Sequence, residues 1–310
     1  MIKSLCLALT VLCFTLNAQA QHRVLLQGNN RLAIIELDGT ISWEMPWGGI
    51  HDLHRLESGL IVVQETMQKV AVIDPMKKAV VWHYDAAQAH PGKKVEVHAF
   101  QPLAEGLLMM AESGPGRIVE VDRNWQVRKE FNLTLDHPDP HRDTRLARKL
   151  INGSYLVCHE GDGKVREYKP DGALAWEYEV PLFGKERKEG HGPEAFGNSV
   201  FSAVRLPNGN TLIGTGNGHS LLEVNPAKEV VWSVHQNDLP GITLAWVTTL
   251  EVLPNGHIVF GNCHAGPGQP LLIEIEPKMK QVVWRLDEFE RFGNDVSNSL
   301  LLDMPGKSVR

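Results

Sequence analysis

Residues 221–232 read LLEVNPAKEVVW: an apolar alternating run, an Asx-Pro turn, and a second run that ends in tryptophan. This phrase occurs in six copies along the chain, with Phe131 replacing the tryptophan in one of them. The other copies are IIELDGTISW (34–43), VAVIDPMKKAVVW (70–82), IVEVDRNWQVRKEF (118–131), VREYKPDGALAW (165–176) and LIEIEPKMKQVVW (272–284). Strand-like units that repeat about every 40–50 residues predict a β-propeller with one four-stranded blade per repeat.

Each repeat divides into four strands, which we call a to d from the propeller axis outwards. Strands a and b flank a glycine turn such as Asn208-Gly209 or Asn255-Gly256, and both residues of such a turn are expected to adopt positive φ. Strand b is almost wholly apolar, as a strand covered on both faces requires. Strands c and d form the repeated phrase, and we expect its tryptophans to pack between blades rather than to hold a ligand.

The two ends of the chain complete each other. The first repeat lacks strand a, because residues 22–24 already enter strand b, whereas residues 297–302 look like a strand a without a blade of its own. We expect this C-terminal strand to pair beside residues 24–26 and close the ring, which removes the exposed edges. The predicted fold is all-β: one six-bladed propeller domain of four-stranded antiparallel blades over residues 21–310.

Residues 1–20 have the pattern of a secretory signal peptide, with Lys3, an apolar run over residues 5–16, and the small-x-small site Ala18-Gln19-Ala20. We expect cleavage after Ala20 and a secreted or periplasmic protein. The apolar run is too short for a membrane span. The net charge of −6 gives no indication of the basic surface that nucleic-acid-binding proteins have. We expect a monomer.

Two cysteines, Cys158 and Cys263, remain after that cleavage. One disulfide between them is possible in an oxidising compartment, but the repeat places them two blades apart, which argues against a bridge. Of the two alternatives, we favour buried free thiols.

Two repeat positions carry polar residues that differ from blade to blade. Eight residues before the turn glycine, where strand a starts, stand His51, His98, Arg145, Phe201 and Thr248, with Ser297 on the closing strand. Six residues after that glycine, where strand b ends, stand Glu65, Glu112, His159, Thr215 and Asn262. Both strand ends lie on one face of a propeller, so these residues are candidates for an axial binding site. Two interpretations are open: they bind a ligand, or they plug the narrow axis and bond to each other.

Three loops belong to the same face. Residues 184–194 form the longest polar insertion, interpreted either as a lid that carries His191 or as a surface loop. Residues 287–295 are a candidate for the opposite rim. Residues 137–143, HPDPHRD, have groups that bind divalent metals, and Cys263-His264 could add ligands, but no spacing matches a known zinc pattern. We favour a solvated acidic loop and expect no metal.

The phrases VIDPMKKAVVW, EVNPAKEVVW and EIEPKMKQVVW, with LPNGNTLIGTGNG and LPNGHIVFGNC, resemble the repeats of quinoprotein-like (PQQ-like) β-propellers. They also resemble arylsulfotransferase-type propellers, where His-Asp often opens a blade, as His51-Asp52 does here. The resemblance covers residues 23–303 and implies the blade type rather than an activity. Quinoprotein dehydrogenases usually have eight blades and often adjacent cysteines over the quinone. With about six blades and no Cys-Cys pair here, we expect no quinone and no other cofactor.

Arylsulfotransferases use a histidine nucleophile with Arg, His and Asn in the funnel. His51, His98, Arg145 and Asn262 are residues of these types, although none matches that family's catalytic motif.

Two functions are compatible with these patterns, and the fold decides neither. The first is a secreted binding protein that recognises a small anionic or carbohydrate ligand through His51, His98, Arg145, His159, Thr248, Asn262 and His191. The second is an exported enzyme, either an arylsulfotransferase-like group transferase or a carbohydrate lyase or hydrolase. In it a histidine would act as base or nucleophile, Arg145 would neutralise the anion, and Glu65 or Glu112 would serve as acid/base or as orienting group.

Overall fold

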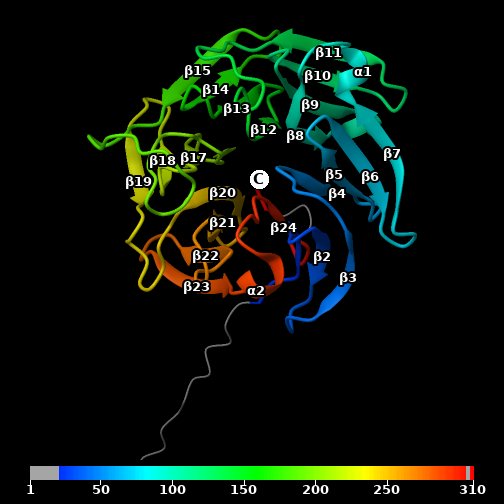
Figure 1. Cartoon of the computed structure of the whole chain (residues 1–310). Coiled ribbons are helices and arrows are strands. Elements are labelled where there is room, and N and C mark those ends of the chain that lie inside the picture. Colours follow the sequence, from blue (N-terminus) through cyan, green and yellow to red (C-terminus); the bar gives the residue numbers. More distant parts are fainter. Residues whose placement is uncertain (1–20, 305–307) are drawn as a thin grey trace, which may run out of the picture.

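The computed structural model describes residues 21–304 and 308–310, so the predicted signal peptide lies outside the described residues. The described residues form six four-stranded antiparallel sheets arranged in a ring (Figure 1). The predicted six-bladed propeller is confirmed. No helix in this part of the chain has the length and apolar character needed to cross a membrane.

The first three blades, from the axis outwards, follow the predicted order a to d. Blade 1 contains β24 (Ser299–Leu301), β1 (Val24–Gly28), β2 (Arg31–Ile35) and β3 (Ile41–Pro46). Blade 2 contains β4 (Leu53–Arg55), β5 (Ile61–Thr66), β6 (Lys69–Asp74) and β7 (Ala79–Asp85). Blade 3 contains β8 (Glu96–Pro102), β9 (Leu108–Ser113), β10 (Arg117–Val121) and β11 (Val127–Asn132).

The other three blades repeat this order. Blade 4 contains β12 (Ala147–Lys149), β13 (Tyr155–His159), β14 (Lys164–Tyr168) and β15 (Leu174–Glu179). Blade 5 contains β16 (Ser202–Arg205), β17 (Thr211–Gly214), β18 (Leu221–Val224) and β19 (Val230–Val234). Blade 6 contains β20 (Trp246–Val252), β21 (Ile258–Cys263), β22 (Leu272–Glu276) and β23 (Gln281–Leu286). Short helical turns occur at α1 (Ala86–Ala89), η1 (Ala104–Gly106) and α2 (Phe289–Phe292).

The turns between strands a and b differ from the expected two-residue geometry. At Asn208-Gly209 only the glycine has positive φ, 88°, and the backbone bond from Leu206 N to Asn210 O closes a longer loop. The Asn208 side chain accepts a hydrogen bond from Asn210 N at 2.9 Å, which lets asparagine keep a negative φ. The turn signal is therefore correct in place, and the prediction of positive φ at both residues is wrong here.

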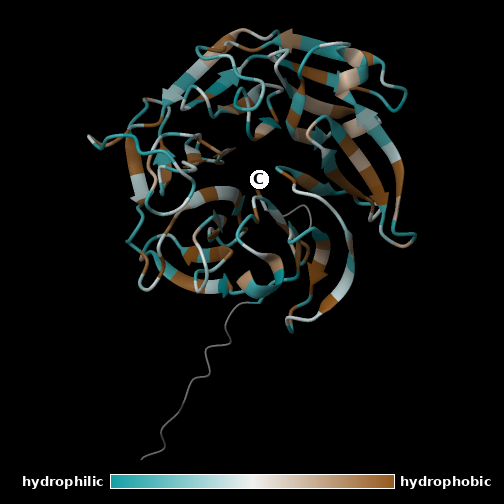
Figure 2. Ribbon diagram, in the orientation of Figure 1, coloured by the Kyte–Doolittle hydropathy of each residue, from teal (hydrophilic) through white to brown (hydrophobic). Residues whose placement is uncertain are grey.

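Apolar packing between the blades forms the core. Strand b is buried along its whole length in β1, β9, β13, β17 and β21, in agreement with its continuous apolar sequence. Figure 2 shows hydrophobic residues concentrated along the strands and hydrophilic residues in the connecting loops.

The tryptophans of strand d connect adjacent blades, as expected. The indole nitrogen of Trp43 donates to Pro75 O in the next blade at 2.8 Å, and that of Trp82 donates to Arg123 O at 2.9 Å. Trp176 and Trp232 make the equivalent bonds to Pro226 O and Pro277 O. A repeated aromatic residue thus combines buried area with one directional contact between blades.

The C-terminal segment closes the ring. β24 pairs with β1 in antiparallel register, with Val24 opposite Leu301 and Leu26 opposite Ser299, so the predicted closure is confirmed. Beyond it, Val309 forms a bridge with Val252, and Arg310 donates to Leu53 O at 3.0 Å. The C-terminus therefore lies at the centre of the ring in Figure 1.

Cys158 and Cys263 are buried free thiols, as predicted. Burial raises the pKa of both thiols, so neither has the character of a reactive thiolate.

Closure by β24 predicts an uneven response to two leucine truncations. Leu301→Ala removes a side chain that is 1% exposed in the closing strand, so we expect a loss of about 2–5 kcal/mol in the free energy of unfolding. Leu174→Ala, on the outer strand β15, truncates a side chain that is 45% exposed and should cost less than about 0.5 kcal/mol. Urea denaturation measures both, and equal losses would contradict a stabilising role for the closing strand.

Candidate functional site

The start of the inner strands surrounds a cavity of about 760 Å³ at one face of the ring, which we call the funnel. This volume is within the range of small-molecule sites. The wall comes from the beginnings of strands a, and the rim comes from loops before or within blades 4, 5 and 6.

The structure brings the predicted strand-a residues together. Five of them line the funnel: His51, Arg145, Phe201, Thr248 and Ser297. His98 is fully buried beside His51, with 4.6 Å between the ring centroids. Every strand a begins on the same face of the ring. The side chains at this one repeat position, one from each blade, therefore converge on the axis.

The predicted strand-b residues lie elsewhere. Glu112 is buried and bonds to Tyr84 Oη at 3.0 Å, His90 Nε2 at 2.8 Å and Arg117 Nε at 2.6 Å. Glu65 has His83 as its nearest basic partner, at 4.0 Å. Strand b lies one strand farther from the axis, so these carboxylates meet side chains within and between blades rather than the funnel.

The remaining strand-b residues are also committed to local bonds. Asn262 accepts from Ala245 N at 2.9 Å, and Thr215 Oγ1 bonds to Ser220. His159 is fully buried, with Nδ1 2.8 Å from Asp143 O and Nε2 2.9 Å from Tyr168 Oη. These side chains support the loops that shape the funnel without lining it.

Arg145 is the central cation of the funnel wall. Its Nε forms an ion pair with Glu160, and its Nη1 lies 2.8 Å from His98 Nδ1. Burial lowers the pKa of the Arg145 guanidinium, and the Glu160 carboxylate opposes that shift. Arg142, about half exposed, shares Glu160 at 3.1 Å, so one carboxylate balances two cations.

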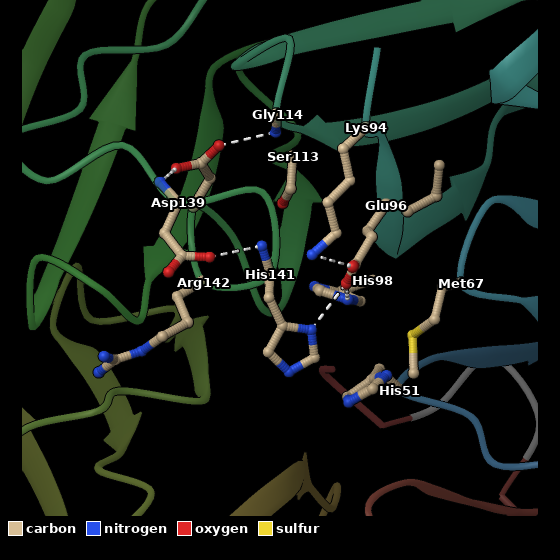
Figure 3. A network of polar contacts seen from close by, with 12 residues as sticks. His51, Met67, Lys94, Glu96, His98, Ser113, Gly114, Asp139, His141 and Arg142 are labelled. Carbon is tan, nitrogen blue, oxygen red and sulfur yellow. Dashed lines mark hydrogen bonds and ion pairs between the residues drawn. The ribbon is translucent and has the colours of Figure 1, made fainter. Parts of the chain in front are cut away.

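Sequence reasoning missed Glu96, which joins two funnel histidines (Figure 3). Its Oε2 lies 2.9 Å from His98 Nε2 and 2.7 Å from His141 Nδ1, and Lys94 Nζ lies 3.2 Å from Oε1. Burial favours a higher pKa for Glu96, but the bonds from His98, His141 and Lys94 outweigh it and lower the pKa well below its usual range. The alternation Glu96-Val97-His98 was the available signal, because residues two apart in a strand share a face.

His98 is neutral at physiological pH. Burial lowers its pKa to about 4, although the adjacent Glu96 carboxylate opposes the shift. The ring therefore retains a lone pair on one nitrogen.

The insertion over residues 184–194 reaches the funnel. Its residues 187–191 are among the lining residues, and the His191 ring stacks on Trp246 at 5.1 Å and lies 5.1 Å from the His264 ring. This places the loop where a lid would lie; its opening remains a prediction.

The second insertion, residues 287–295, contacts a residue of the funnel lining, His264, through its C-terminal end. His264 Nδ1 lies 3.1 Å from Asp295, and His264 N donates to Asn294 O at 2.8 Å. The α2 turn of this insertion instead packs Phe292 into the core.

A buried ion pair links blade 2 to blade 4. Arg148 donates from Nη1 and Nη2 to Asp52 at 2.8 and 3.0 Å. Asp52 also lies 3.5 Å from His54, as expected for alternate residues on one strand face. Burial favours a raised pKa for Asp52, but Arg148 and His54 outweigh it, so the pKa lies well below its usual range and the group stays ionised.

Comparison with known proteins places the chain among propellers. A family model described as outer membrane protein assembly factor BamB matches residues 28–286. No curated protein matches the chain. A solved structure of a protein of unknown function from Bacteroides caccae is 25% identical, with a TM-score of 0.73, and the match covers 90% of this chain and 98% of that chain.

Two more distant structures share the fold alone. A streptogramin B lyase is 13% identical, with a TM-score of 0.53 over 78% of this chain and 70% of that chain. The WD40 propeller domain of Doa1 is 16% identical, with a TM-score of 0.54 over 77% of this chain and 71% of that chain.

His159 makes the stability of the protein depend on pH. Burial, with Arg166 nearby, lowers its folded-state pKa to about 4, whereas an unfolded histidine has a pKa of about 6.5. Between these values the unfolded chain binds more protons, so stability falls as the pH drops from about 6.5 towards 4.

We expect this one group to remove roughly 2 kcal/mol from the free energy of unfolding between pH 7.5 and pH 5. Urea unfolding at the two pH values should show a smaller loss in His159→Gln than in the wild-type protein. An identical loss in both proteins would contradict the assignment to His159.

Proposed function

The chain belongs to the PQQ-like propeller family whose model is described as outer membrane protein assembly factor BamB, and we propose that its funnel binds a small anionic sugar in an exported protein. The proposal concerns the funnel, because a propeller fold hosts many unrelated functions.

The charge of the funnel carries the proposal. Its lining includes the cations Arg142, Arg145, Arg187 and Lys188 but only two carboxylates, Glu160 and Glu189. This excess of cations occurs in a chain whose net charge is −6. Guanidinium groups in a partly desolvated cavity bind carboxylate or sulfate groups through charge-assisted hydrogen bonds.

Aromatic side chains in the same cavity favour a sugar as the carrier of that charge. Trp246, Phe201 and the His191 ring provide flat apolar faces beside the cations. A sugar ring presents both apolar C–H faces and polar hydroxyls, and the polar groups at Ser199 and Asn217 can bond to the latter. Uronates and sulfated sugars combine these properties.

Export is part of the proposal. The signal pattern of residues 1–20 supports a periplasmic or secreted protein, where sugar ligands from outside the cell would be met. We further propose that the protein acts as a monomer, because the single ring already contains the funnel.

A second candidate is an exported lyase, hydrolase or group transferase. The specific observation that favours it is the Glu96–His141 bond, in which a buried carboxylate orients a histidine ring at the funnel. A carboxylate in this role sets the ring tautomer and stabilises the protonated ring, as a general base requires. Glu96 would take the orienting role that the sequence suggested for Glu65 or Glu112.

Binding of digalacturonate and of a sulfated disaccharide tests the main proposal. Arg187→Ala should weaken both by about tenfold, the usual cost of losing one charge-assisted bond. Arg128→Ala is the matched control, because Arg128 is an exposed arginine on the outer strand β11. Isothermal titration calorimetry gives the affinities, and product analysis of the same mixtures tests the enzymatic alternative.

Affinity for the acidic sugars should exceed that for neutral lactose and should fall at high salt. Equal binding of neutral and acidic sugars, or no binding of any of them by the folded protein, would refute an anionic-sugar site.

A further inference from the structure

One cluster in the funnel wall has the composition of a metal site. The ligand atoms of Glu96, His98 and His141 all lie within 4.8 Å of one another. They come from two segments that fold together: β8 supplies the carboxylate and one histidine, and the loop before β12 supplies the other. Figure 3 shows the three side chains converging on a single point.

We propose that Glu96, His98 and His141 bind one divalent first-row transition metal ion, with an open coordination position towards the funnel. Two imidazoles and one carboxylate are a donor set used by Zn²⁺ and by Fe²⁺ or Mn²⁺ sites that keep positions free for a substrate or water. Nitrogen donors disfavour Mg²⁺ and Ca²⁺, which prefer oxygen.

The distances suit an ion after a small movement. Glu96 Oε2 lies 2.9 Å from His98 Nε2 and 2.7 Å from His141 Nδ1, as hydrogen-bonded pairs do. Metal–ligand bonds of about 2.0–2.2 Å require ligand atoms roughly 3.3 Å apart. Each pair must therefore separate by about half an ångström, which the half-exposed His141 ring on its loop allows.

Groups behind the cluster can orient the ligands. Metal binding requires the His98 tautomer with its proton on Nδ1, in place of the Nε2–H that bonds to Glu96 without the ion. Nδ1 lies 3.1 Å from the backbone oxygen of Thr144, so that oxygen can accept the Nδ1–H and leave Nε2 for a metal. Arg145 Nη1 now also approaches His98 Nδ1, but it has His141 O as a second acceptor at 2.6 Å. Lys94 contacts Glu96 Oε1 and leaves Oε2 for the ion.

The neighbouring cations oppose a metal ion less than their number implies. Arg145 is paired with Glu160, which offsets part of its charge, although Glu160 also pairs with Arg142.

A metal ion at this cluster would take part in the proposed binding of an anionic sugar. The His51 ring centroid lies 4.6 Å from that of His98 and 6.5 Å from that of His141, so the cluster borders the residues that line the funnel. An ion would face the same cavity as Arg142 and add a second anchor for an anionic sugar. The metal inference itself needs no sugar, so the two proposals can fail separately.

The test is a Zn²⁺ titration of the full-length mature protein after removal of metals with EDTA and desalting. We expect one Zn²⁺ per chain by calorimetry, and a visible absorption band when Co²⁺ replaces it. His141→Ala and Glu96→Gln should weaken Zn²⁺ binding at least tenfold and abolish the Co²⁺ band. Thermal melting establishes that each variant is folded.

His137→Ala is the matched control, because His137 lies on the same loop and lines the funnel but is outside the cluster. It should bind Zn²⁺ as the wild-type protein does. Absence of stoichiometric binding in the wild-type protein would overturn the inference, and so would unchanged binding in His141→Ala. If digalacturonate binds but Zn²⁺ does not, the metal inference fails while the proposed function stands. If Zn²⁺ binds but no acidic sugar does, the reverse holds.

Discussion

Pairing of β24 with β1 is the contact on which the arrangement of the funnel depends, because it joins the two ends of the chain in one sheet. The same segment also holds the start of blade 2. Asn298 donates to His51 O at 2.8 Å, Ser297 Oγ bonds to Ile50 O, and Arg310 donates to Leu53 O. Closure of the ring and placement of His51 therefore have a common cause. A ring without β24 would expose the edge of β1 and release one side of the funnel.

The funnel is built by varying one position on a repeated frame. Packing between blades uses similar residues in every repeat, as the tryptophan bonds to the next blade illustrate. At the start of strand a, packing imposes no such uniformity, so His51, Arg145 and Thr248 can occupy equivalent places. Arg145, His98 and His51 have partners in Glu160, Glu96 and Gln64, respectively. The Thr248 hydroxyl has no hydrogen-bond partner among the described residues. The structure bears on one of the two interpretations of the ring, because the charged groups bond to each other. A cavity remains beside them, and ligand binding stays a prediction.

Prediction succeeded where local pattern and topology coincide. The common location of the strand-a residues was predicted because a repeat position and a shared strand direction set their place, and their role in binding stays a prediction. Glu112 and His159 were misplaced by the same argument, since it located the end of strand b along the axis but not its distance from the axis. Glu96 was not predicted as a site residue, because its role depends on contact with His141, 45 residues away in the sequence. No local sequence pattern encodes that proximity.

The sequence by itself determined the six blades, the tail closure, the inter-blade tryptophans and the face that carries the funnel. Periodicity is sufficient for these features, because each repeat buries its apolar strands only by stacking on the next. Only the tertiary structure decided which polar side chains meet: Glu96 with His98 and His141, Asp52 with Arg148, and His191 with Trp246. Such contacts depend on how loops of different blades approach in space, to within the few ångströms over which hydrogen bonds form.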